Sequence, residues 1–377
     1  MKILHIMQRE KFTAGVVGFY DKYFANGEHE ICYLNLERDK PLINEALLIK
    51  QREIYLSGNM LKDIRLIGKE LHADRYDYIV AHSLLLPVAF KIYLATHRSA
   101  LKKLVWIEWG ADLYLWKPKT KGIKAFVRTK MEQKIRTKLS DVVCIFPPDC
   151  ELYKKTFAKS RADVYYAPYC SCVDKLDGKE YVVQSHLEQT KKNEETVYIQ
   201  VGHSAAPALN HIEALDALKK FADEDIKIFL PLNYGDMEYA DRVADHARSL
   251  FGDKAIILRE MMSRDEYFAL LERIDIAIFN TYRQIALGNI GVMVFRNVKL
   301  YMPQESVMYS YFEENGAPIC TLESLKDISF DEFSTAVYPA DVEAFREYLR
   351  AYHSVNEKMR SWEKIYNSLK DKLTEKR

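Results

Sequence analysis

The feature that most constrains this chain is an alternation of strand and helix patterns that runs through its first half and then begins again. Short runs rich in Val, Ile and Tyr are separated by amphipathic segments. Near-continuous apolar strands of this kind indicate a parallel sheet buried on both faces, with helices as connections. The predicted strands cover 2–7, 29–36, 76–83, 103–110, 141–146 and 163–167, and the predicted helices cover 14–25, 61–72, 85–96 and 121–139.

The second half predicts another parallel sheet. Its strands are expected at 196–201, 226–232, 255–258, 275–279, 299–302 and 318–321, and its helices at 211–222, 237–251, 283–295 and 307–314. A further helix begins at Ser263, because Glu266 completes the spacing of a capping box. A chain of 377 residues suggests two domains. We therefore predict an α/β protein with facing Rossmann-like domains at 1–172 and 196–340, a polar linker at 173–195 and a helical tail at 341–377.

Charge and hydropathy exclude several classes of protein. The formal net charge is +1, which gives no overall attraction for nucleic acid, so no nucleic-acid partner is expected. No run of about 18 apolar residues occurs, so no membrane-spanning helix is expected. The apolar start of the chain is too short for a signal peptide and is expected to be a buried strand. The six cysteines are scattered through the chain, and several lie inside apolar strand patterns, so we expect reduced core cysteines in a cytoplasmic protein.

Residues that follow strands are the candidates for a site, because ligands of parallel α/β sheets bind outside the carboxyl ends of the strands. In the first half, Asp112 comes just after the strand that ends at Gly110. A carboxylate in that position can take the proton from a hydroxyl group, so Asp112 is our first candidate for a catalytic base, the alternative being a helix cap. His82 also ends a strand and is the second candidate, although a structural histidine fits equally well. Glu108 is a weaker alternative base.

In the second half, the loop at Gly202 and Ser204 leads to a helix whose natural N-cap is Asn210. Free N–H groups and the positive end of a helix dipole suit a diphosphate. The planar guanidinium of Arg283 suits phosphate oxygens as well. Five more residues that follow strands complete the predicted donor-binding set: Tyr234, Glu260, Gln284, Gly288 and Glu305. Taken singly, each of these residues fits a surface or capping role; their shared position after successive strands is the argument for a site.

One segment is strongly basic. Between Lys117 and Lys138 the sole acidic residue is Glu132, and apolar residues are interleaved with the basic ones. A basic amphipathic helix of this kind is typical of a surface that docks on anionic lipid, the alternative being a solvated helix face. The predicted membrane-docking residues are Trp116, Lys121, Lys124, Arg128, Lys130 and Lys134.

The run Trp109-Gly110-Ala111-Asp112-Leu113-Tyr114, together with the segments 201–204, 210–215 and 283–284, resembles the bacterial 4-acetamido-4,6-dideoxygalactose (Fuc4NAc) transferases of glycosyltransferase family 56. The resemblance extends from about His82 to Glu305. It implies a GT-B fold, a dTDP-linked amino-deoxysugar donor and an undecaprenyl-diphosphate-linked acceptor. It also implies peripheral attachment to the cytoplasmic face of the bacterial inner membrane, as in the synthesis of enterobacterial common antigen. The candidate residues that match the family by residue type are Asp112, His82, Gly202, Ser204, Asn210, Glu260, Arg283, Gln284, Gly288 and Glu305. The loop between Ser204 and Asn210 departs from the family in being less polar here.

We therefore predict a glycosyltransferase for cell-surface polysaccharide that moves a sugar from a nucleotide donor to a lipid-linked saccharide. No Asp-x-Asp pair follows a strand, and GT-B enzymes usually bind no metal, so neither a metal ion nor a cofactor is expected. Two alternatives remain open from the sequence. One is a nucleotide-sugar epimerase of the same fold, and the other is a non-catalytic module that binds sugars or nucleotides.

Overall fold

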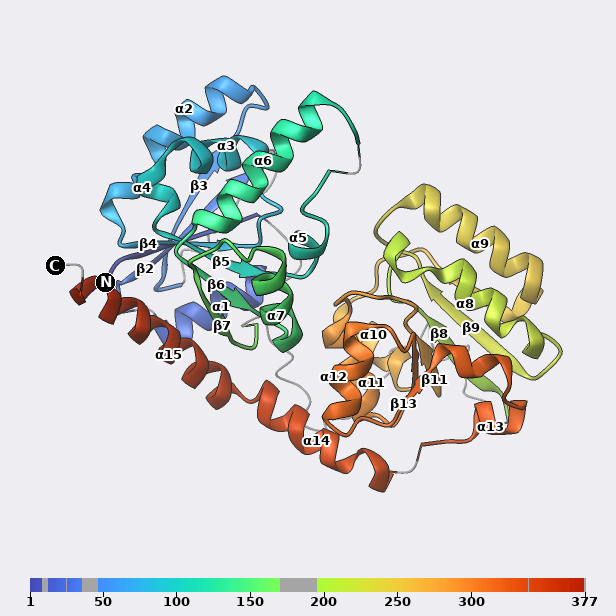
Figure 1. Cartoon of the computed structure of the whole chain (residues 1–377). Coiled ribbons are helices and arrows are strands. Elements are labelled where there is room, and N and C mark those ends of the chain that lie inside the picture. The colour runs from blue at the N-terminus through green and yellow to red at the C-terminus, as the bar shows by residue number, and fades with distance from the viewer. Residues whose placement is uncertain are drawn as a thin grey trace. The chain divides into compact units, whose positions relative to one another are not determined.

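The computed structural model describes residues 1–8, 13–24, 26–35, 47–118, 120–169, 195–337 and 339–375. The predicted linker at 173–195 lies outside these residues except for Glu195. The chain divides into two compact units (Figure 1), the first made of Met1–Cys172 with Tyr352–Arg377 and the second of Val173–Ala351. Each unit contains one parallel sheet with helices on both faces, as the alternating pattern predicted.

The sheet of the first unit has seven strands in the order β3-β2-β1-β4-β5-β6-β7. Every neighbouring pair is parallel. The strands are β1 (Ile3–Met7), β2 (His29–Asn35), β3 (Lys50–Tyr55), β4 (Tyr78–His82), β5 (Leu104–Glu108), β6 (Asp141–Cys144) and β7 (Asp163–Tyr166). Six of them confirm predicted strands, and the edge strand β3 was not predicted.

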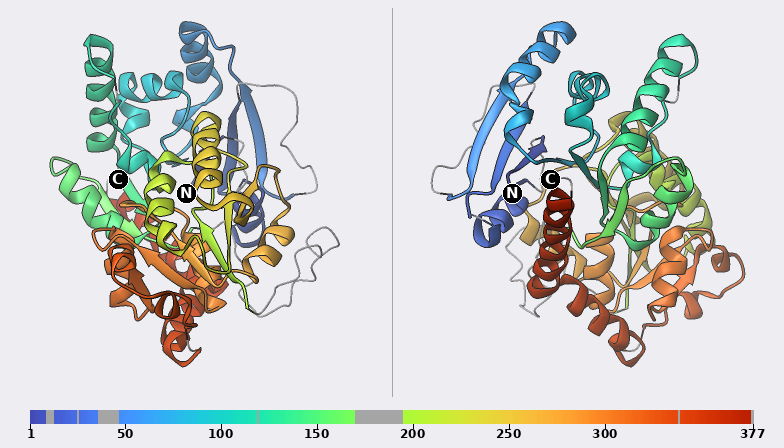
Figure 2. Two further views of the ribbon diagram at one scale, coloured as in Figure 1. Left: turned by 90° about the vertical axis from the view of Figure 1, so that its right-hand side faces the viewer. Right: turned by 60° about the vertical axis from the view of Figure 1, so that its left-hand side comes forward.

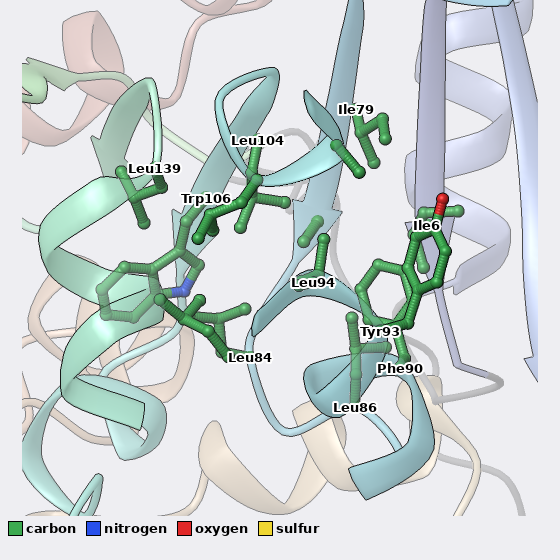
Figure 3. Packing of buried hydrophobic residues seen from close by; sticks show 14 of the residues in the cluster. Ile6, Ile79, Leu84, Leu86, Phe90, Tyr93, Leu94, Leu104, Trp106 and Leu139 are labelled. Atoms are coloured by element: carbon green, nitrogen blue, oxygen red, sulfur yellow. The ribbon is translucent and has the colours of Figure 1, made fainter. Parts of the chain in front are cut away.

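Alternate residues of these strands enter two different cores. One face packs against α2 (Met60–Glu70), α3 (Val88–Thr96), α4 (Arg98–Leu101), α5 (Ala111–Tyr114), α6 (Ile123–Lys138) and α7 (Pro147–Thr156). Figure 3 shows this core, where the fully buried Trp106 lies close to Leu84 and Leu139. The other face packs against α1 (Thr13–Phe24) and α15 (Val355–Glu375). The strands therefore read as nearly continuous apolar runs because neither face meets water.

The sheet of the second unit has six strands in the order β10-β9-β8-β11-β12-β13, again all parallel. They are β8 (Val197–Val201), β9 (Ile226–Pro231), β10 (Ala255–Leu258), β11 (Ile276–Ile278), β12 (Lys299–Met302) and β13 (Ile319–Thr321). The helices are α8 (His211–Leu218), α9 (Met237–Phe251), α10 (Arg264–Leu271), α11 (Leu287–Phe295), α12 (Val307–Glu314), α13 (Phe330–Ser334) and α14 (Pro339–His353). Figure 1 shows α8 and α9 on the opposite side of this sheet from α10, α11 and α12.

Helix starts follow the predicted chemistry in part. Before α10, the Ser263 N–H donates to Glu266 at 2.8 Å and the Glu266 N–H donates to Ser263 Oγ at 3.2 Å, which is the predicted capping box. The helix predicted from Arg283 starts instead at Leu287. Arg283 therefore lies in the loop between β11 and α11.

The predicted helical tail is divided between the units. In α14, Arg346 donates to the carbonyl of Phe295 in the second unit at 3.0 Å. In α15, the hydroxyl groups of Tyr366 and Tyr20 lie 2.7 Å apart, and Trp362 donates to the carbonyl of Pro168 at 3.1 Å. The right-hand view of Figure 2 shows α15, in dark red, beside α1. The last helix is thus part of the first unit's core.

Candidate active site

Each sheet has one switch point. There the chain, after adding strands on one side of the first strand, crosses over and adds the remaining strands on its other side. In the first sheet it lies between β1 and β4, and in the second between β8 and β11. The crevice outside the carboxyl ends of strands at a switch point is the usual ligand site of parallel α/β sheets. The predicted donor-binding residues all follow strands of the second sheet, and because these strands are parallel the topology gathers the residues at one edge.

Gly202 ends β8 at the switch point of the second sheet. Its N–H donates to the carbonyl of Ile278 in β11 at 2.9 Å, and its φ is +65°, a conformation that favours glycine. A Cβ atom at this position would lie 2.3 Å from Nε2 of His211, at the start of α8. Glycine is therefore required both for the turn and for the close approach of α8.

Asn210 precedes α8 but does not cap it as predicted. Its backbone is left-handed, with φ +40° and ψ +49°, and its side chain makes no capping bond. Instead, its amide donates to the carbonyl of Asn280, and the Asn280 amide donates back to the carbonyl of Asn210, both at 3.1 Å. The Asn280 amide also lies 3.2 Å from the carboxylate of Glu213. Asn210 thus joins the loop after β8 to the loop after β11, a role that helix propensity alone does not predict.

The loop after β8 is also tied to the loop after β9. The Ala205 N–H donates to the carbonyl of Tyr234 at 2.8 Å, and the Asp236 N–H donates to the carbonyl of Ala205 at 3.0 Å. A Cβ on Gly235 would lie 2.8 Å from the Ala205 backbone, so a side chain there would separate the two loops. Ser204 is buried beside this contact. Backbone hydrogen bonds therefore fix the positions of Ser204 and Tyr234 at the edge.

The remaining predicted donor residues differ in exposure. Arg283 is half-buried, and its guanidinium donates to the carbonyl of Gln284 at 3.2 Å, while Gln284 itself is buried. Gly288 lies exposed in the first turn of α11, where backbone N–H groups have no partner within the helix. Glu260 and Glu305 are exposed after β10 and β12. Arg283, the start of α11 and the carboxylates of Glu260 and Glu305 thus all follow strands of this sheet.

Two polar residues here, the buried Gln200 and the half-buried Tyr267, were not predicted. The Gln200 amide donates to the carbonyl of Gly202 at 2.8 Å and to the hydroxyl of Tyr267 at 3.1 Å. Burial raises the pKa of Tyr267, so its hydroxyl is neutral. A polar residue inside the apolar strand β8 was the one available signal for Gln200, and nothing in the sequence pairs it with Tyr267.

In the first unit, Asp112 is buried and its carboxylate accepts three hydrogen bonds. Oδ2 accepts from the backbone N–H of Leu84 at 2.6 Å and from the indole N–H of Trp106 at 2.7 Å, and Oδ1 accepts from the N–H of Trp109 at 2.8 Å. These bonds join the turn after β4 to the turn after β5. The geometry favours the structural alternative for Asp112, a residue that positions both turns.

His82 ends β4 at the switch point of the first sheet. Its Nε2 lies 3.0 Å from Nδ1 of His5, and its Nδ1 lies 3.5 Å from the hydroxyl of Tyr169. Burial lowers the pKa of His82 to about 3, so the ring is neutral at physiological pH. The next residue, Ser83, has φ +74°, an uncommon conformation for a residue with a side chain that often marks functional sites. His82 is thus held at a strained turn with one ring nitrogen directed toward Tyr169.

Glu108, the weaker alternative base, is also fully buried. It accepts from the N–H of Gly110 at 2.7 Å and from the N–H of Ile145 at 3.2 Å. Burial, with the charges of Asp149 and Asp112, raises the pKa of Glu108 well above its ordinary value. Its contacts stabilise the turn at Gly110, where φ is +75°.

Most of the basic segment forms α6. The predicted docking residues differ in how exposed they are. Four of the predicted basic residues are exposed on α6, namely Lys124, Arg128, Lys130 and Lys134, and Lys121 is exposed just before the helix. Beside them the apolar side chains of Ile123, Phe126 and Val127 are 84%, 62% and 60% exposed. Trp116 differs from the prediction, because it is half-buried with its ring 5.2 Å from that of Phe157. The apolar part of this surface is therefore on α6 itself.

The inner face of α6 carries a buried ion-pair network. Glu132 pairs with Lys91 of α3 at 2.6 Å and with Arg136 one turn further along α6 at 2.5 Å. Arg136 also donates to the carbonyl of Asp112 at 2.8 Å and stacks on Trp106. The network therefore fixes α6 to the turn that holds Asp112.

Among the described parts of the chain, none of the helices has the length and apolar character needed to span a bilayer.

Two Rossmann-like units in one chain are the architecture of the GT-B fold, which enzymes of more than one activity share. The chain belongs to the family described as 4-alpha-L-fucosyltransferase glycosyl transferase group 56, whose model matches residues 63–337. This match confirms the resemblance to family 56 and identifies the chain as a transferase.

Solved structures of low sequence identity share the fold. A glycosyltransferase from Rickettsia africae has a TM-score of 0.63 at 14% identity, over 98% of each chain. Sucrose-phosphate synthase from Thermosynechococcus elongatus has a TM-score of 0.70 at 13% identity, over 98% of this chain and 99% of its own. HepE from Anabaena, in complex with UDP, has a TM-score of 0.66 at 12% identity, over 98% of this chain and 100% of its own. The GT-B prediction is therefore confirmed.

Proposed function

We propose that this glycosyltransferase transfers an amino-deoxysugar of the Fuc4NAc type from a dTDP-linked donor to a saccharide carried on undecaprenyl diphosphate. The product would serve cell-surface polysaccharide synthesis at the cytoplasmic face of a bacterial inner membrane. The observation that carries the donor half is the switch point of the second sheet, where Gly202, Asn210 and Asn280 hold two loops together. Membership of family 56 and the UDP complex of the Anabaena relative support a nucleotide sugar as donor.

In the proposed reaction, a hydroxyl oxygen of the acceptor attacks the anomeric carbon of the donor sugar. The bond from that carbon to the diphosphate breaks, and the nucleoside diphosphate leaves with the electron pair. Arg283 and the N-terminal N–H groups of α11 would stabilise the charge on the diphosphate. Tyr234, Glu260 and Glu305 would contact the rest of the donor, and the proposal includes no metal ion.

We assign the acceptor proton to Nδ1 of His82. The Asp112 carboxylate already accepts three N–H groups, whereas His82 directs this nitrogen toward Tyr169 at the carboxyl edge. Asp112 would then support the reaction by holding the turn at His82. Replacing His82 with glutamine should lower kcat about a hundredfold or more, because general-base catalysis contributes on that order.

Donor binding is tested by the thermal stabilisation that dTDP, UDP, GDP and CMP give to the purified protein. At equal concentration, a ligand that binds the folded state more tightly raises the melting temperature more, and we expect dTDP to give the largest shift. Arg283→Gln should weaken dTDP binding about ten- to a hundredfold, since a hydrogen bond to a charged group contributes about 1.5–3 kcal/mol. Arg259→Gln is the matched control, because Arg259 follows the neighbouring strand β10 but pairs with Asp241 at 2.7 Å.

Turnover separates the proposal from its alternatives. Release of dTDP should require the lipid-linked saccharide and should persist with a metal chelator. A changed sugar nucleotide in the absence of any acceptor would identify an epimerase. Nucleotide binding without turnover, unaffected by His82→Gln, would identify a binding module. A larger thermal shift with UDP than with dTDP would contradict the proposed donor while leaving the transferase class intact.

We also propose that α6 docks the enzyme on anionic lipid. Reversing three charges with Lys124→Glu, Arg128→Glu and Lys134→Glu should strongly reduce co-sedimentation with vesicles that contain phosphatidylglycerol, because each basic residue near an anionic surface contributes about 1 kcal/mol. The matched control is Lys62→Glu, Arg65→Glu and Lys69→Glu on α2, which reverses the same three charges on another exposed helix of the same unit. Equal loss of binding in both triple variants would mean that charge, and not this helix, governs attachment.

A further inference from the structure

Three histidines form a continuous hydrogen-bonded chain across the first sheet. His82 Nε2 lies 3.0 Å from Nδ1 of His5 in β1, and His5 Nε2 lies 2.9 Å from Nδ1 of His29 in β2. His5 uses its two ring nitrogens for two different histidines, so the three rings are connected in series. His82 is at the carboxyl end of its strand, His5 in the middle and His29 at the amino end. The chain therefore crosses the sheet diagonally from the candidate site to the opposite edge.

The three histidine rings are buried in the core of the first unit. His5, His29 and His82 are all buried, on the face of the sheet that α1 and α15 cover. The ring of Tyr20 from α1 lies 4.3 Å from His5, and the ring of Tyr366 from α15 lies 4.9 Å from His29. Burial lowers the pKa of His29 to about 4 and that of His5 well below its ordinary value. All three rings are therefore neutral, and each holds one proton on one of its two nitrogens.

The two ends of the chain differ in their surroundings. At the carboxyl edge, His82 faces the hydroxyl of Tyr169. At the amino edge, the neighbouring carboxylate of Glu28 raises the pKa of His29 against the effect of burial. Glu28 is 38% exposed and accepts from the amino group of Met1 at 2.8 Å, and this hydrogen bond is the main cause of the lowered pKa of Glu28. The same amino group lowers the pKa of His29, against the effect of Glu28. A positive charge is thus better tolerated at the His29 end, next to a carboxylate and water, than at His82.

We propose that His82, His5 and His29 are a proton relay that removes the acceptor proton from the candidate active site. The inference rests on the proposed role of His82 as base. The acceptor O–H bond breaks and its proton joins His82 Nδ1. The proton of His82 Nε2 then passes to His5 Nδ1, that of His5 Nε2 passes to His29 Nδ1, and that of His29 Nε2 leaves toward Glu28 and water.

The relay explains how His82 can act as a base although burial lowers its pKa. A proton that stayed on His82 would create an isolated imidazolium in a buried position, which is strongly disfavoured. When the Nε2 proton moves on, His82 remains neutral throughout the transfer. After the product leaves, a proton from water returns to His29 Nε2, the ring protons shift back one place, and the Nδ1 proton of His82 passes to water at the site. Each ring then again holds one proton on Nε2, and the net change is the transfer of the acceptor proton to solvent. His5 and His29 are thus relay residues that never contact the substrate.

The test compares three variants at or beside His29, the last histidine of the relay. His29→Phe fills the same aromatic surroundings but interrupts the relay, and we expect kcat to fall at least tenfold with an unchanged KM for the donor. His29→Gln keeps one donor and one acceptor but cannot pass a proton through, so it should lower kcat as much as His29→Phe does. Tyr366→Phe is the matched control, since Tyr366 packs on the same ring outside the relay, and its kcat should equal that of the unaltered enzyme. Full activity of His29→Gln would overturn the relay, because it would show that His29 acts only through its hydrogen bonds.

Nitrogen-15 NMR of the histidine rings gives an answer that does not depend on turnover. The relay requires protons on Nε2 of all three rings in the free enzyme, so that each ring donates to the next. Two bare nitrogens or two N–H groups facing each other would overturn it. If His82 carries its proton on Nδ1, its role as base fails together with the relay. If Nδ1 is bare but His29→Gln is fully active, the relay alone fails and the proposed function stands.

Discussion

Replacing Glu132 with glutamine should lower the free energy of unfolding by about 3–5 kcal/mol, because it leaves two buried cations without a counter-charge. The side chains of Lys91 and Arg136 are 6% and 2% exposed, and both contact the Glu132 carboxylate. Glutamine has nearly the same shape but no charge, so packing is kept and the electrostatic loss is isolated. Urea unfolding followed by circular dichroism measures the change.

The pH dependence of this loss provides an independent check. Burial alone would raise the pKa of Glu132, but Arg136 and Lys91 outweigh burial and the pKa is lowered. Its contribution to stability is therefore present above the pKa of an unfolded glutamate, about 4.3, and is lost as the pH falls through the folded value. The difference between wild type and Glu132→Gln should shrink in acid. The control is Glu151→Gln, whose pair with Lys154 is exposed and screened by water, so its loss should change the free energy of unfolding very little. Equal effects of the two variants would contradict the buried network.

Asp112→Asn should lower the free energy of unfolding by about 3 kcal/mol and also reduce turnover by two or more decades. The carboxylate accepts three N–H groups, whereas asparagine supplies one oxygen and turns an NH₂ group toward a donor. A buried donor without a partner costs about 1–3 kcal/mol. Turnover falls because the turn that holds His82 loses its support.

The same variant separates a positioning role from a catalytic one. A base that merely loses its charge would lose turnover with little loss of stability, whereas a positioning residue loses both together. Nucleotide affinity should be nearly unchanged, because the proposed nucleotide residues belong to the second unit. Asp77→Asn is the control, since Asp77 accepts one N–H from Lys2 in an exposed position. A stable but inactive Asp112→Asn enzyme would return Asp112 to the role of base.

The strands of both sheets were predictable where burial on two faces leaves an apolar run. The exception, β3, is an edge strand that pairs with β2 alone, and in it just Ile54 is buried. Its charged sequence has no apolar run because half of it faces water. Its position is set by the partner strand, which a local pattern does not contain.

The position of candidate residues was predictable, but their orientation was not. Chain order places Asp112 after a strand, yet whether its carboxylate faces a substrate or the Leu84 and Trp109 backbone depends on the turn at Gly110. Glu132 likewise lies in a basic segment that predicts a solvated face, and it is buried instead.

The contact between the three histidines could not be predicted from the sequence for a different reason. In the sequence, His29 lies 24 residues after His5, and His82 lies 77 residues after His5. They meet because β1 lies between β2 and β4, and that order is a property of the assembled sheet. A histidine inside each of three apolar strands was the available signal.

The first unit takes its last helix from the far end of the chain, and this has a consequence for biosynthesis. The ribosome must finish the whole second unit before α15 emerges to cover β1 and α1. Until then the nascent first unit keeps an open apolar surface, with His5 and His29 reachable by water. A gene fragment that stops near codon 172 therefore encodes an unfinished product, and an independent version of this unit needs residues 352–377 restored, either through a short tether or as a co-expressed peptide.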